Sequence, residues 1–396
     1  MIQISPETQL FIREHSSDDV RALALQAKKY PDINMPTAIT QIAGRQVAAE
    51  KIPSWREIEE IWYPKHLSLE QCSSEITARY KARLFQGDSL IDLTGGFGID
   101  CSFLATGFKT ATYVERQEEL CEIAAHNFPI LNLNHINVKN EDGVSYLQAM
   151  SPVDCIFLDP ARRNEHGGKT VAISDCEPDV AELEELLLNK AGQVMVKLSP
   201  MLDLSLALKE LQHVQEVHII SANNECKELL LILGQASVEE ISIHCVNLPT
   251  KGIQEEQHFV FTREQEQCSE CNYTNVLENY LYEPNASLLK AGAFRSIASA
   301  FPVKKLHPNS HLYTSDVLVE SFPGRAFHII SQCSLNKKEL KESLGDLKKA
   351  NITVRNFPAT VAELRKRIKL SEGGDTYLFA STLNNGQKVL IRCEKA

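Results

Sequence analysis

The stretch LIDLTGGFGIDCSFLA, residues 90–105, places three glycines within four positions between two apolar segments. Glycine costs about 0.5–1 kcal/mol inside regular structure relative to alanine, so such a cluster at a strand end indicates a sharp turn or a close backbone approach. A bound phosphate, a bound nucleoside or a tight turn alone would each explain the cluster. The residues around the glycines distinguish these three explanations.

Short apolar segments alternate with amphipathic ones around this stretch, from about residue 86 to residue 235. The predicted strands are SLIDL, TATYVE, HINVK, CIFLD, QVMVKLS, EVHIIS and ELLLIL, and the predicted helices are GIDCSFLATG, QEELCEIAAHNF and DVAELEELLLNKAG. This alternation predicts an α/β fold with a parallel sheet covered on both faces. In such a fold, ligands bind at the carboxyl ends of the strands.

The rest of the chain divides into three further regions. Residues 1–85 carry apolar residues at spacings of three and four, which predicts a helical N-terminal region. Residues 236–322 are rich in predicted strands and contain one helical segment at 285–301. Residues 323–396 read as a small α+β domain, so we expect region boundaries near residues 85, 235 and 322.

The composition indicates a soluble, reduced protein. No run of 18 or more apolar residues occurs, and the N-terminus lacks a basic segment followed by an apolar core, so we expect a cytoplasmic protein with no membrane contact. The odd number of cysteines, 11, favours reduced thiols over a disulfide framework. Only Cys268 and Cys271 have C-x-x-C spacing, and without a second pair we expect no metal site.

Charge is distributed unevenly along the chain. The net charge is −11, but residues 322–396 contain 14 Lys+Arg against 7 Asp+Glu, a net charge of +7 in an otherwise acidic protein. Such a split indicates a part of the chain that faces a polyanion. A solvated lysine-rich helix, such as residues 337–349, explains the same composition, and both interpretations stay open.

The residues beside the glycines favour one kind of ligand. A dinucleotide-binding loop has the pattern G-x-G-x-x-G, whereas here the glycines run G-G-x-G after Asp92-Leu-Thr. An acid at the end of the strand suits a ligand with an ammonium group, which indicates S-adenosylmethionine. The candidate cofactor-binding residues of this loop are Asp92, Thr94, Gly95, Gly96, Phe97 and Gly98.

Two more acids follow the next two predicted strands. Glu115 ends TATYVE, where a carboxylate can accept hydrogen bonds from both ribose hydroxyls of an adenosine. Asp142 follows the third strand and could reach the adenine amino group. A single carboxylate at a strand end is commonly just solvated, but three at successive strand ends beside a glycine loop predict a nucleoside site.

These motifs resemble those of a known family. DLTGGFGID, YVE, NEDG and FLDPARR resemble, in this order, the motifs of class I S-adenosylmethionine-dependent methyltransferases. EQCSSEITARYKARL, NECKE, YEPNASLLKAGAF and RNFPATVAELRKRIKLSEGGDTYLFAST resemble bacterial methyltransferase-like proteins with a THUMP-like C-terminal domain. The resemblance implies a seven-stranded Rossmann-like sheet (86–235) with its last strand antiparallel, a helical extension (1–85), a ferredoxin-like region (236–322) and a THUMP-like domain (323–396).

The resemblance also implies methyl transfer, with RNA as the acceptor. Asp159, Pro160 and Arg162 stand where amine-directed base methyltransferases have an Asp-Pro-Pro-aromatic motif, so they are the candidate catalytic residues, with Asp159 also beside the cofactor. The second proline is Ala161 here and the aromatic is Arg162, whose guanidinium could stack on a base or grip a phosphate. We favour an exocyclic amine as acceptor.

Carbon-5 uridine methyltransferases also carry an Asp-Pro-Ala-Arg motif, but they need a cysteine near the end of the fifth strand. That segment reads VMVKLSPMLDLS here and contains no thiol. Serine is a poor substitute nucleophile without an adjacent base. The sequence therefore disfavours carbon-5 chemistry.

Two further sets of residues complete the expected sites. Gln71, Ser74 and Thr77 precede the first strand, in a segment that resembles one holding the methionine end of the cofactor in base-amine methyltransferases; a capped helix start is the alternative. The candidate RNA-binding residues are Arg325, Arg355, Arg365, Arg367 and Lys369. Two other functions stay open: an RNA-binding protein without catalysis, suggested by the missing aromatic, and a small-molecule methyltransferase, favoured by the acidic charge.

Overall fold

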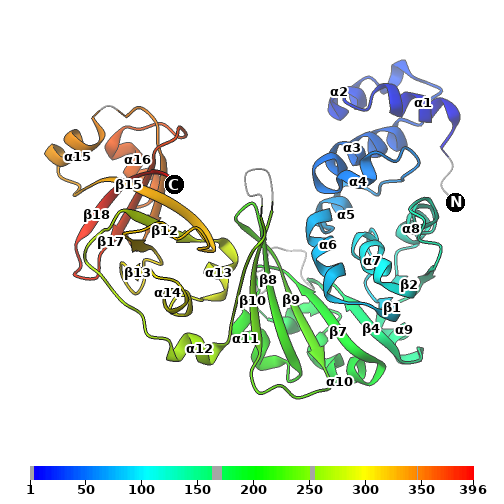
Figure 1. Ribbon diagram of the computed structural model, residues 1–396. Helices are drawn as coiled ribbons and strands as arrows, with labels where there is room; N and C mark the ends of the chain where they lie inside the picture. Colours follow the sequence, from blue (N-terminus) through cyan, green and yellow to red (C-terminus); the bar gives the residue numbers. More distant parts are fainter. Residues whose placement is uncertain (1–3, 163–171, 250–254, 346) are drawn as a thin grey trace. The chain divides into compact units, whose positions relative to one another are not determined.

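The structure is a computed structural model that describes residues 4–162, 172–249, 255–345 and 347–396. The chain forms two compact units: Met1–Gln215 with Leu229–Val238, and Glu216–Glu228 with Glu239–Ala396 (Figure 1). In the described part of the chain, we find no helix with both the length and the apolar character needed to cross a membrane.

The first unit begins with the expected helical region. Ser5, Asp19 and Asn34 each accept a hydrogen bond from a backbone N–H group at the start of the following helix, which explains where these helices begin. The helices bury apolar side chains among themselves and against Phe97, Ile99 and Ile123 of the next region. The elements are α1 (Pro6–Glu14), α2 (Val20–Leu25), η1 (Ala27–Lys29), α3 (Met35–Lys51), α4 (Pro53–Arg56), α5 (His66–Gln71) and α6 (Glu75–Leu84).

A sheet of alternating β and α elements follows, as the sequence predicts. The strands of this unit are β1 (Gly87–Asp92), β2 (Phe108–Glu115), β3 (Ile136–Asn140), β4 (Val153–Leu158), β7 (Ala191–Leu198) and β9 (Glu225–Gly234), in the order β9–β7–β4–β1–β2–β3. Neighbouring strands run parallel, except that β9 runs antiparallel to β7, which confirms the expectation for the last strand. The strands' apolar centres are buried, so both faces of the sheet are covered.

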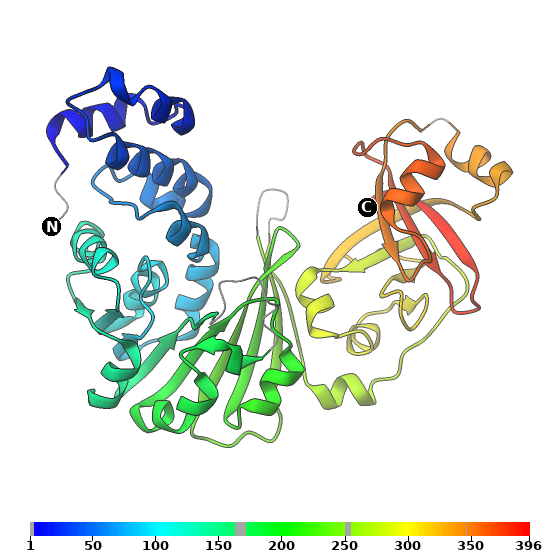
Figure 2. The same ribbon diagram turned by 180° about the vertical axis from the view of Figure 1, so that it is seen from behind.

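Helices connect these strands. They are α7 (Ile99–Leu104), η2 (Ala105–Gly107), α8 (Glu118–Ile130), α9 (Gly143–Ala149), η3 (Ile173–Asp175), α10 (Val180–Lys190) and α11 (Leu204–Glu210). In Figure 2, α10 lies in front of the strands and buries Val180, Leu187 and Leu188 on its inner side. Two short strands, β5 (Ala161–Arg162) and β6 (Cys176–Glu177), pair with each other beside the end of β4.

The strands β10 and β11 pair in a way that the sequence did not predict. The strand β10 (Ser242–Leu248) lies parallel to β8 (Val214–Ala222) and antiparallel to β11 (Gln257–Phe261). We expected β10 and β11 in the ferredoxin-like region, whereas β8 is the sixth of the seven strands expected for the methyltransferase sheet, and that expectation is confirmed. The expected boundary at residue 235 therefore falls between paired strands, because strand pairing across a long connection leaves no local sequence signal.

A seven-stranded sheet forms the rest of the second unit, in the order β13–β14–β12–β15–β18–β17–β16. Its strands are β12 (Tyr280–Pro284), β13 (Lys304–Lys305), β14 (Tyr313–Ser315), β15 (Gly324–Cys333), β16 (Asn351–Arg355), β17 (Tyr377–Thr382) and β18 (Lys388–Lys395). Since β12 pairs with β15, the expected ferredoxin-like and THUMP-like regions share one sheet.

The helices of the second unit are short. They are α12 (Arg263–Cys268), α13 (Ala286–Ala291), α14 (Ser296–Ala300), α15 (Lys337–Leu344) and α16 (Val361–Ile368). The single helix expected over 285–301 is wrong, since the structure divides it into α13 and α14. Gly292 ends α13 with a φ of 80°, a left-handed conformation that favours glycine and stops the helix.

Candidate active site

The glycines of the loop after β1 are required for two reasons, backbone conformation and packing. Gly96 and Gly98 have φ values of 53° and 84°, which a residue with a side chain adopts only at a cost. A Cβ atom on Gly95 would lie 2.2 Å from the Tyr113 ring, so glycine is required there by packing. A Cβ atom on Gly96 would meet only the Thr94 carbonyl oxygen, at 3.8 Å. The backbone at Gly96 is therefore the part of the loop that a ligand can approach closely.

Glu115 holds this loop in place from the end of β2. One carboxylate oxygen accepts the Gly96 N–H at 2.9 Å, and the other accepts the Gln117 N–H at 2.9 Å. The Tyr113 hydroxyl donates to the Gly96 carbonyl at 2.5 Å. The carboxylate of Glu115 is thus fixed at the carboxyl edge of the sheet, where each of its oxygens still has a lone pair for a further donor.

Asp92 ends β1 as a buried carboxyl group. Its side chain accepts the Thr94 N–H at 3.0 Å, and the residue is only 1% exposed. Burial raises the pKa of Asp92 well above its usual range, and the neighbouring carboxylates of Asp100, Asp159 and Glu115 raise it further. The site therefore concentrates negative charge, and a positively charged ligand group beside Asp92 would relieve that repulsion.

Two other predicted cofactor residues have structural roles. Asp142 caps α9, where one oxygen accepts hydrogen bonds from the N–H groups of Val144 and Ser145. Phe97 is buried and packs against the rings of Trp55 and Tyr63, so its side chain belongs to the core between the N-terminal helices and the sheet. Only the backbone of Phe97 is available to a ligand in the loop.

The segment before β1 reaches the site through a residue that the sequence did not single out. The Ser73 hydroxyl donates to Asp100 at 2.7 Å, and the Lys81 ammonium donates to Ser73 at 3.0 Å. By contrast, the Ser74 and Thr77 hydroxyls bond to each other at 3.3 Å at the start of α6. Gln71, at the end of α5, is exposed. Ser73 therefore links this segment to the site.

Asp159 is joined to the glycine loop and to a lysine that the sequence analysis did not assign. Its backbone N–H donates to the Thr94 hydroxyl at 2.6 Å, and its carboxylate accepts from the Lys197 ammonium at 2.5 Å. Lys197 lies at the end of β7 and is nearly buried. The sequence does contain a signal for this contact. A lysine inside the apolar segment VMVKLS predicts a buried ammonium with an acidic partner, since an unpaired ammonium is rarely buried.

A buried ion-pair network extends from Lys197 toward the N-terminal helices. Asp100 lies 3.6 Å from the Lys197 ammonium and 3.1 Å from that of Lys81, which is fully buried. Burial opposes the ionisation of Asp100, but Lys81 and Lys197 outweigh this effect and lower the pKa of its carboxyl group. The network therefore fixes the position of Lys197, and through it the position of the Asp159 carboxylate.

The rest of the Asp-Pro-Ala-Arg motif continues away from β4. Pro160 is buried directly after Asp159, and the backbone of Arg162 lies in β5. The side chain of Arg162 and residues 163–171 lie outside the described part of the structure. The expected stacking or phosphate contact of Arg162 thus remains a prediction.

Two of the predicted RNA-binding arginines bind a buried acid. The guanidinium groups of Arg325 on β15 and Arg355 on β16 both bond to the carboxylate of Glu283, a buried residue on β12. Removing one partner of such an ion pair leaves a buried charge uncompensated, so these arginines stabilise the sheet. Their side chains are the weaker candidates for contact with RNA.

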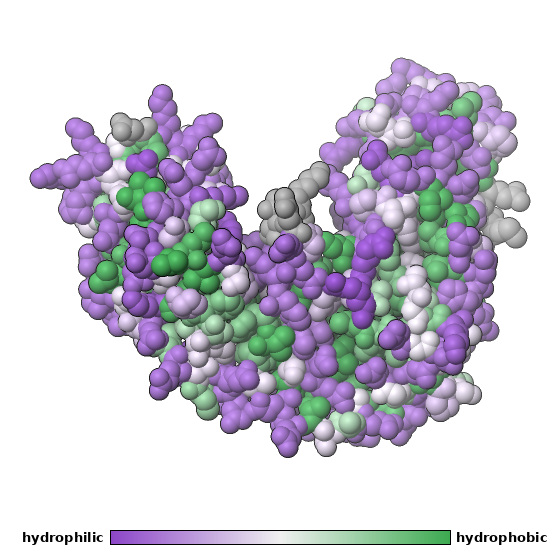
Figure 3. All heavy atoms as spheres, in the orientation of Figure 1, coloured by the Kyte–Doolittle hydropathy of each residue, from purple (hydrophilic) through white to green (hydrophobic). Residues whose placement is uncertain are grey.

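The other three predicted RNA-binding residues lie on or just after α16. Arg365 is half-buried and donates to the Ala350 carbonyl, whereas Arg367 and Lys369 are exposed. On the face shown in Figure 3, the surface around α15 and α16 is mostly hydrophilic. Further exposed basic residues of these helices and their flanks are Lys337, Lys338, Lys341, Lys348, Lys349 and Lys366.

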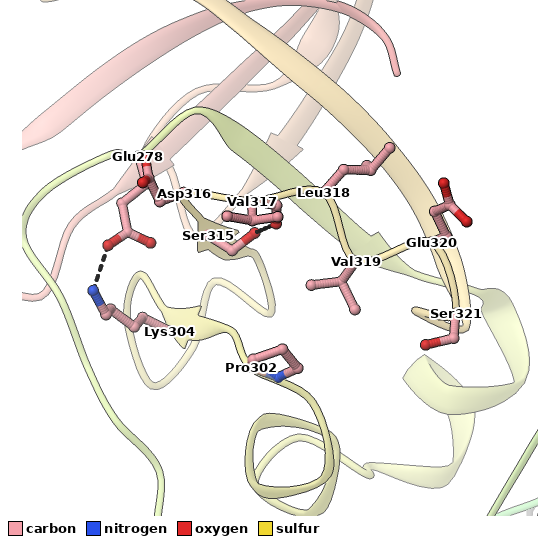
Figure 4. Close-up of a pocket in the computed structure, with 10 residues that line it drawn as sticks. All are labelled: Glu278, Pro302, Lys304, Ser315, Asp316, Val317, Leu318, Val319, Glu320 and Ser321. Carbon is pink, nitrogen blue, oxygen red and sulfur yellow. Dashed lines mark hydrogen bonds and ion pairs between the residues drawn. The ribbon is translucent and has the colours of Figure 1, made fainter.

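A pocket in the second unit contains none of the residues described above. It has a volume of about 690 Å³ and is lined by Glu278, Pro302, Lys304 and residues 315–321. Figure 4 shows the ion pair between Lys304 and Glu278 at one side and the exposed residues Glu320 and Ser321 at the other. Because it is open and lacks a cluster of converging reactive groups, we do not assign it a function.

Three protein-family models match separate parts of the chain. Residues 57–164 match a model described as protein-L-isoaspartate(D-aspartate) O-methyltransferase. Residues 280–323 match a model described as a ferredoxin-like domain, and residues 324–395 match one described as THUMP domain-like. No curated protein matches the chain.

Solved structures include two distant matches. An rRNA methylase from Streptococcus thermophilus has 14% identity and a TM-score of 0.31, over 41% of this chain and 96% of that chain. A "putative methyltransferase" from Streptococcus mutans in complex with SAH has 15% identity and a TM-score of 0.30, over 40% and 95%. These similarities are too weak to indicate a function.

A third solved structure is similar along its whole length. It is a "putative methyltransferase" from Porphyromonas gingivalis W83, with 35% identity and a TM-score of 0.88 over 100% of both chains. Its match extends over both units of the chain, because it covers every residue. The chain therefore belongs to the family of methyltransferases that carry a ferredoxin-like domain and a THUMP-like C-terminal domain.

Proposed function

We propose that this protein transfers the methyl group of S-adenosylmethionine to an RNA base, with an exocyclic amine as the acceptor. The observation that carries the proposal is the set of acids at the carboxyl edge of the sheet, where Asp92, Glu115 and Asp159 surround the glycine loop. Parallel strands bring their carboxyl ends to one edge, which is where α/β folds bind their ligands.

The residues present fit this cofactor. Asp92 offers a buried acceptor to the ammonium group, and Glu115 offers its remaining lone pairs to the ribose hydroxyls. The second oxygen of Asp142 would take the adenine amine, and Gly96 allows close approach of the loop. When bound, the cofactor supplies a methyl group on a sulfonium, ready for in-line transfer.

Asp159 and Lys197 would act on the acceptor. The Asp159 carboxylate accepts from Lys197 through one oxygen, and among the described residues no hydrogen bond reaches its other oxygen. That oxygen can accept an N–H from an exocyclic amine and orient its lone pair toward the methyl group. Positioning of this kind is the main requirement of such a transfer, so Asp159 orients the acceptor rather than removing its proton in advance.

Cofactor binding is expected to release a proton from Asp92. Because the pKa of Asp92 is raised, its carboxyl group holds a proton at pH values where an exposed aspartate is ionised. A bound cation favours the carboxylate, so the affinity for S-adenosylmethionine should rise with pH up to the raised pKa. Calorimetry in two buffers of different ionisation enthalpy measures the released proton.

Asp92→Asn provides the test of this assignment. The variant should bind the cofactor more weakly. Because an amide has no proton to release, its measured heat of binding should be the same in both buffers. If the wild type showed no buffer dependence at any pH at which it binds, Asp92 would not be the partner of the cation. Preference of the wild type for a nicotinamide dinucleotide would contradict the cofactor proposal altogether.

The C-terminal region would capture the RNA. Exposed lysines and arginines gather on α15, on α16 and in the turns that follow them, in a chain that is acidic elsewhere. Contacts of this kind are made mainly with phosphates, and they release counterions. RNA affinity should therefore fall as salt rises.

Neutralising Lys366, Arg367 and Lys369 together, each to Gln, should weaken RNA binding across unrelated sequences and flatten its salt dependence. Neutralising the exposed Lys28, Lys29 and Lys65 of the N-terminal helices should leave binding unchanged. Filter binding of total cellular RNA at several salt concentrations measures both. An equal loss of RNA affinity in the two triple variants would show that RNA contacts another part of the protein. If the wild type showed no salt-dependent binding, a small-molecule acceptor would be favoured.

A protein acceptor is the second candidate, because the model matching residues 57–164 is described as an isoaspartate O-methyltransferase. That match ends before β7 and so excludes Lys197, the partner of Asp159. Incubation with labelled S-adenosylmethionine and either total RNA or an isoaspartyl peptide separates the two. Label in RNA supports our proposal, and label in the peptide alone overturns it.

A further inference from the structure

Three histidines and a glutamate gather on one face of the sheet formed by β8, β10 and β11. Glu216 and His218 are two residues apart on β8, so their side chains point to the same face. His244 on β10 lies directly across from His218, and His258 on β11 is two residues from Val260, the partner of His244. The strands β8 and β10 lie side by side in Figure 1.

The side chains of this cluster converge. The His218 Nε2 atom lies 3.0 Å from Glu216 Oε2, and the His244 Nε2 atom lies 3.8 Å from the same oxygen. The two rings stack at 4.4 Å, and one ligand atom from each of the three residues falls within 4.8 Å of the others. His218 is buried, His244 is partly buried and the Glu216 side chain is 47% exposed, so solvent reaches the cluster at Glu216.

These distances suit a metal ion. Tetrahedral zinc, with bonds of about 2.0–2.1 Å, holds neighbouring ligand atoms roughly 3.3 Å apart, between the two distances found here. We propose that Glu216, His218 and His244 bind a divalent transition-metal ion such as Zn²⁺. Two imidazoles and one carboxylate leave a fourth position for water or another ligand on the exposed side.

His258 would support this site without binding the ion. Its Nε2 atom lies 3.2 Å from the Nδ1 atom of His244, so that nitrogen can donate to His258 while Nε2 faces the cluster. Histidine ligands of metal ions commonly use their second nitrogen in this way, which fixes the tautomer and the ring orientation. The ion would join β8 and β10, and it is independent of the proposed methyl transfer.

We expected no metal site, because Cys268 and Cys271 are the only pair with C-x-x-C spacing. Glu216 and His218 lie 26 or more residues before His244 in the sequence, and no local spacing marks them as one set. Cys268 is exposed and Cys271 is partly buried, and neither belongs to the cluster. Parallel pairing of β8 with β10 is what brings the ligands together.

Titration of the full chain with Zn²⁺, after treatment with a chelator and dialysis, tests the proposal. We expect one ion per chain and a metal-dependent increase in melting temperature. Glu216→Gln and His244→Ala should each weaken binding by about tenfold or more. Both side chains are partly exposed, so the melting temperatures of the two variants without metal should stay close to that of the wild type. His328→Ala, at an exposed histidine of β15, is the matched control.

Cobalt distinguishes this site from a cysteine site. Co²⁺ bound by imidazole and carboxylate shows visible d–d bands without a thiolate-to-cobalt charge-transfer band. A charge-transfer band would assign the ion to cysteines and overturn the proposal. Zn²⁺ affinity weaker than about 1 mM, or equal affinity in the wild type and in Glu216→Gln and His244→Ala, would overturn it as well.

Discussion

Asp159→Asn is expected to lower the rate of methyl transfer by about 10²-fold or more, which is what a misplacement of about 1 Å at the reacting centre costs. The amide keeps the shape of the side chain, but it is uncharged and has only one acceptor oxygen. It therefore cannot accept hydrogen bonds from Lys197 and from the acceptor amine through separate oxygens, as the carboxylate can. The dissociation constant for S-adenosylmethionine should change by no more than a few-fold, because loss confined to turnover identifies a group used at the reacting centre.

Single-turnover transfer to RNA and calorimetry measure these two quantities. In cells that lack the gene, nucleoside mass spectrometry should show the loss of one methylated base. Wild-type protein should restore this base, and Asp159→Asn should not. Asp88→Asn is the matched control, since Asp88 is an exposed aspartate at the opposite end of β1. Transfer at the wild-type rate by Asp159→Asn would remove this residue from the mechanism.

Lys197→Met separates orientation from binding of the acceptor. If Lys197 positions the Asp159 carboxylate, its loss should lower the transfer rate without a matching loss of RNA affinity. The methionine fills a similar volume at the end of β7, so a large effect would not come from a cavity. Unchanged turnover would restrict Lys197 to the buried ion network with Asp100.

Glu115→Ala is expected to weaken S-adenosylmethionine binding by about 1.5–3 kcal/mol, or roughly 10–150-fold, which is the range for hydrogen bonds to a charged group. Two losses weaken cofactor binding in this variant. The ribose loses its acceptor, and the Gly96 N–H loses the oxygen that holds the loop. The effect should therefore lie toward the upper end of this range.

Calorimetry with S-adenosylhomocysteine measures the same loss without turnover. Glu118→Ala, three residues further on at the exposed start of α8, should bind the cofactor as the wild type does. A folded Glu115→Ala protein with unchanged affinity would show that the carboxylate serves only the loop. The ribose assignment would then be lost.

The alternation of strands and helices between residues 86 and 235 was readable because it depends on local periodicity alone. Because parallel strands bring their carboxyl ends to one edge, the sequence also places Asp92, Glu115 and Asp159 at that edge. The glycines were readable as a group, but their roles were not. The position of the Tyr113 ring shows that Gly95 is required by packing, and a φ of 53° shows that Gly96 is required by backbone conformation.

The sequence by itself therefore determined the α/β class, the loop and the edge of the sheet where the candidate site lies. Only the tertiary structure decided which side chains meet there. Lys197 reaches Asp159 and Asp100, Ser73 replaces Ser74 as the contact from the preceding segment, and Glu283 holds two arginines that composition alone assigned to RNA. The physical reason is that strand pairing and burial join residues far apart in the chain, and these contacts have no period or spacing in the sequence.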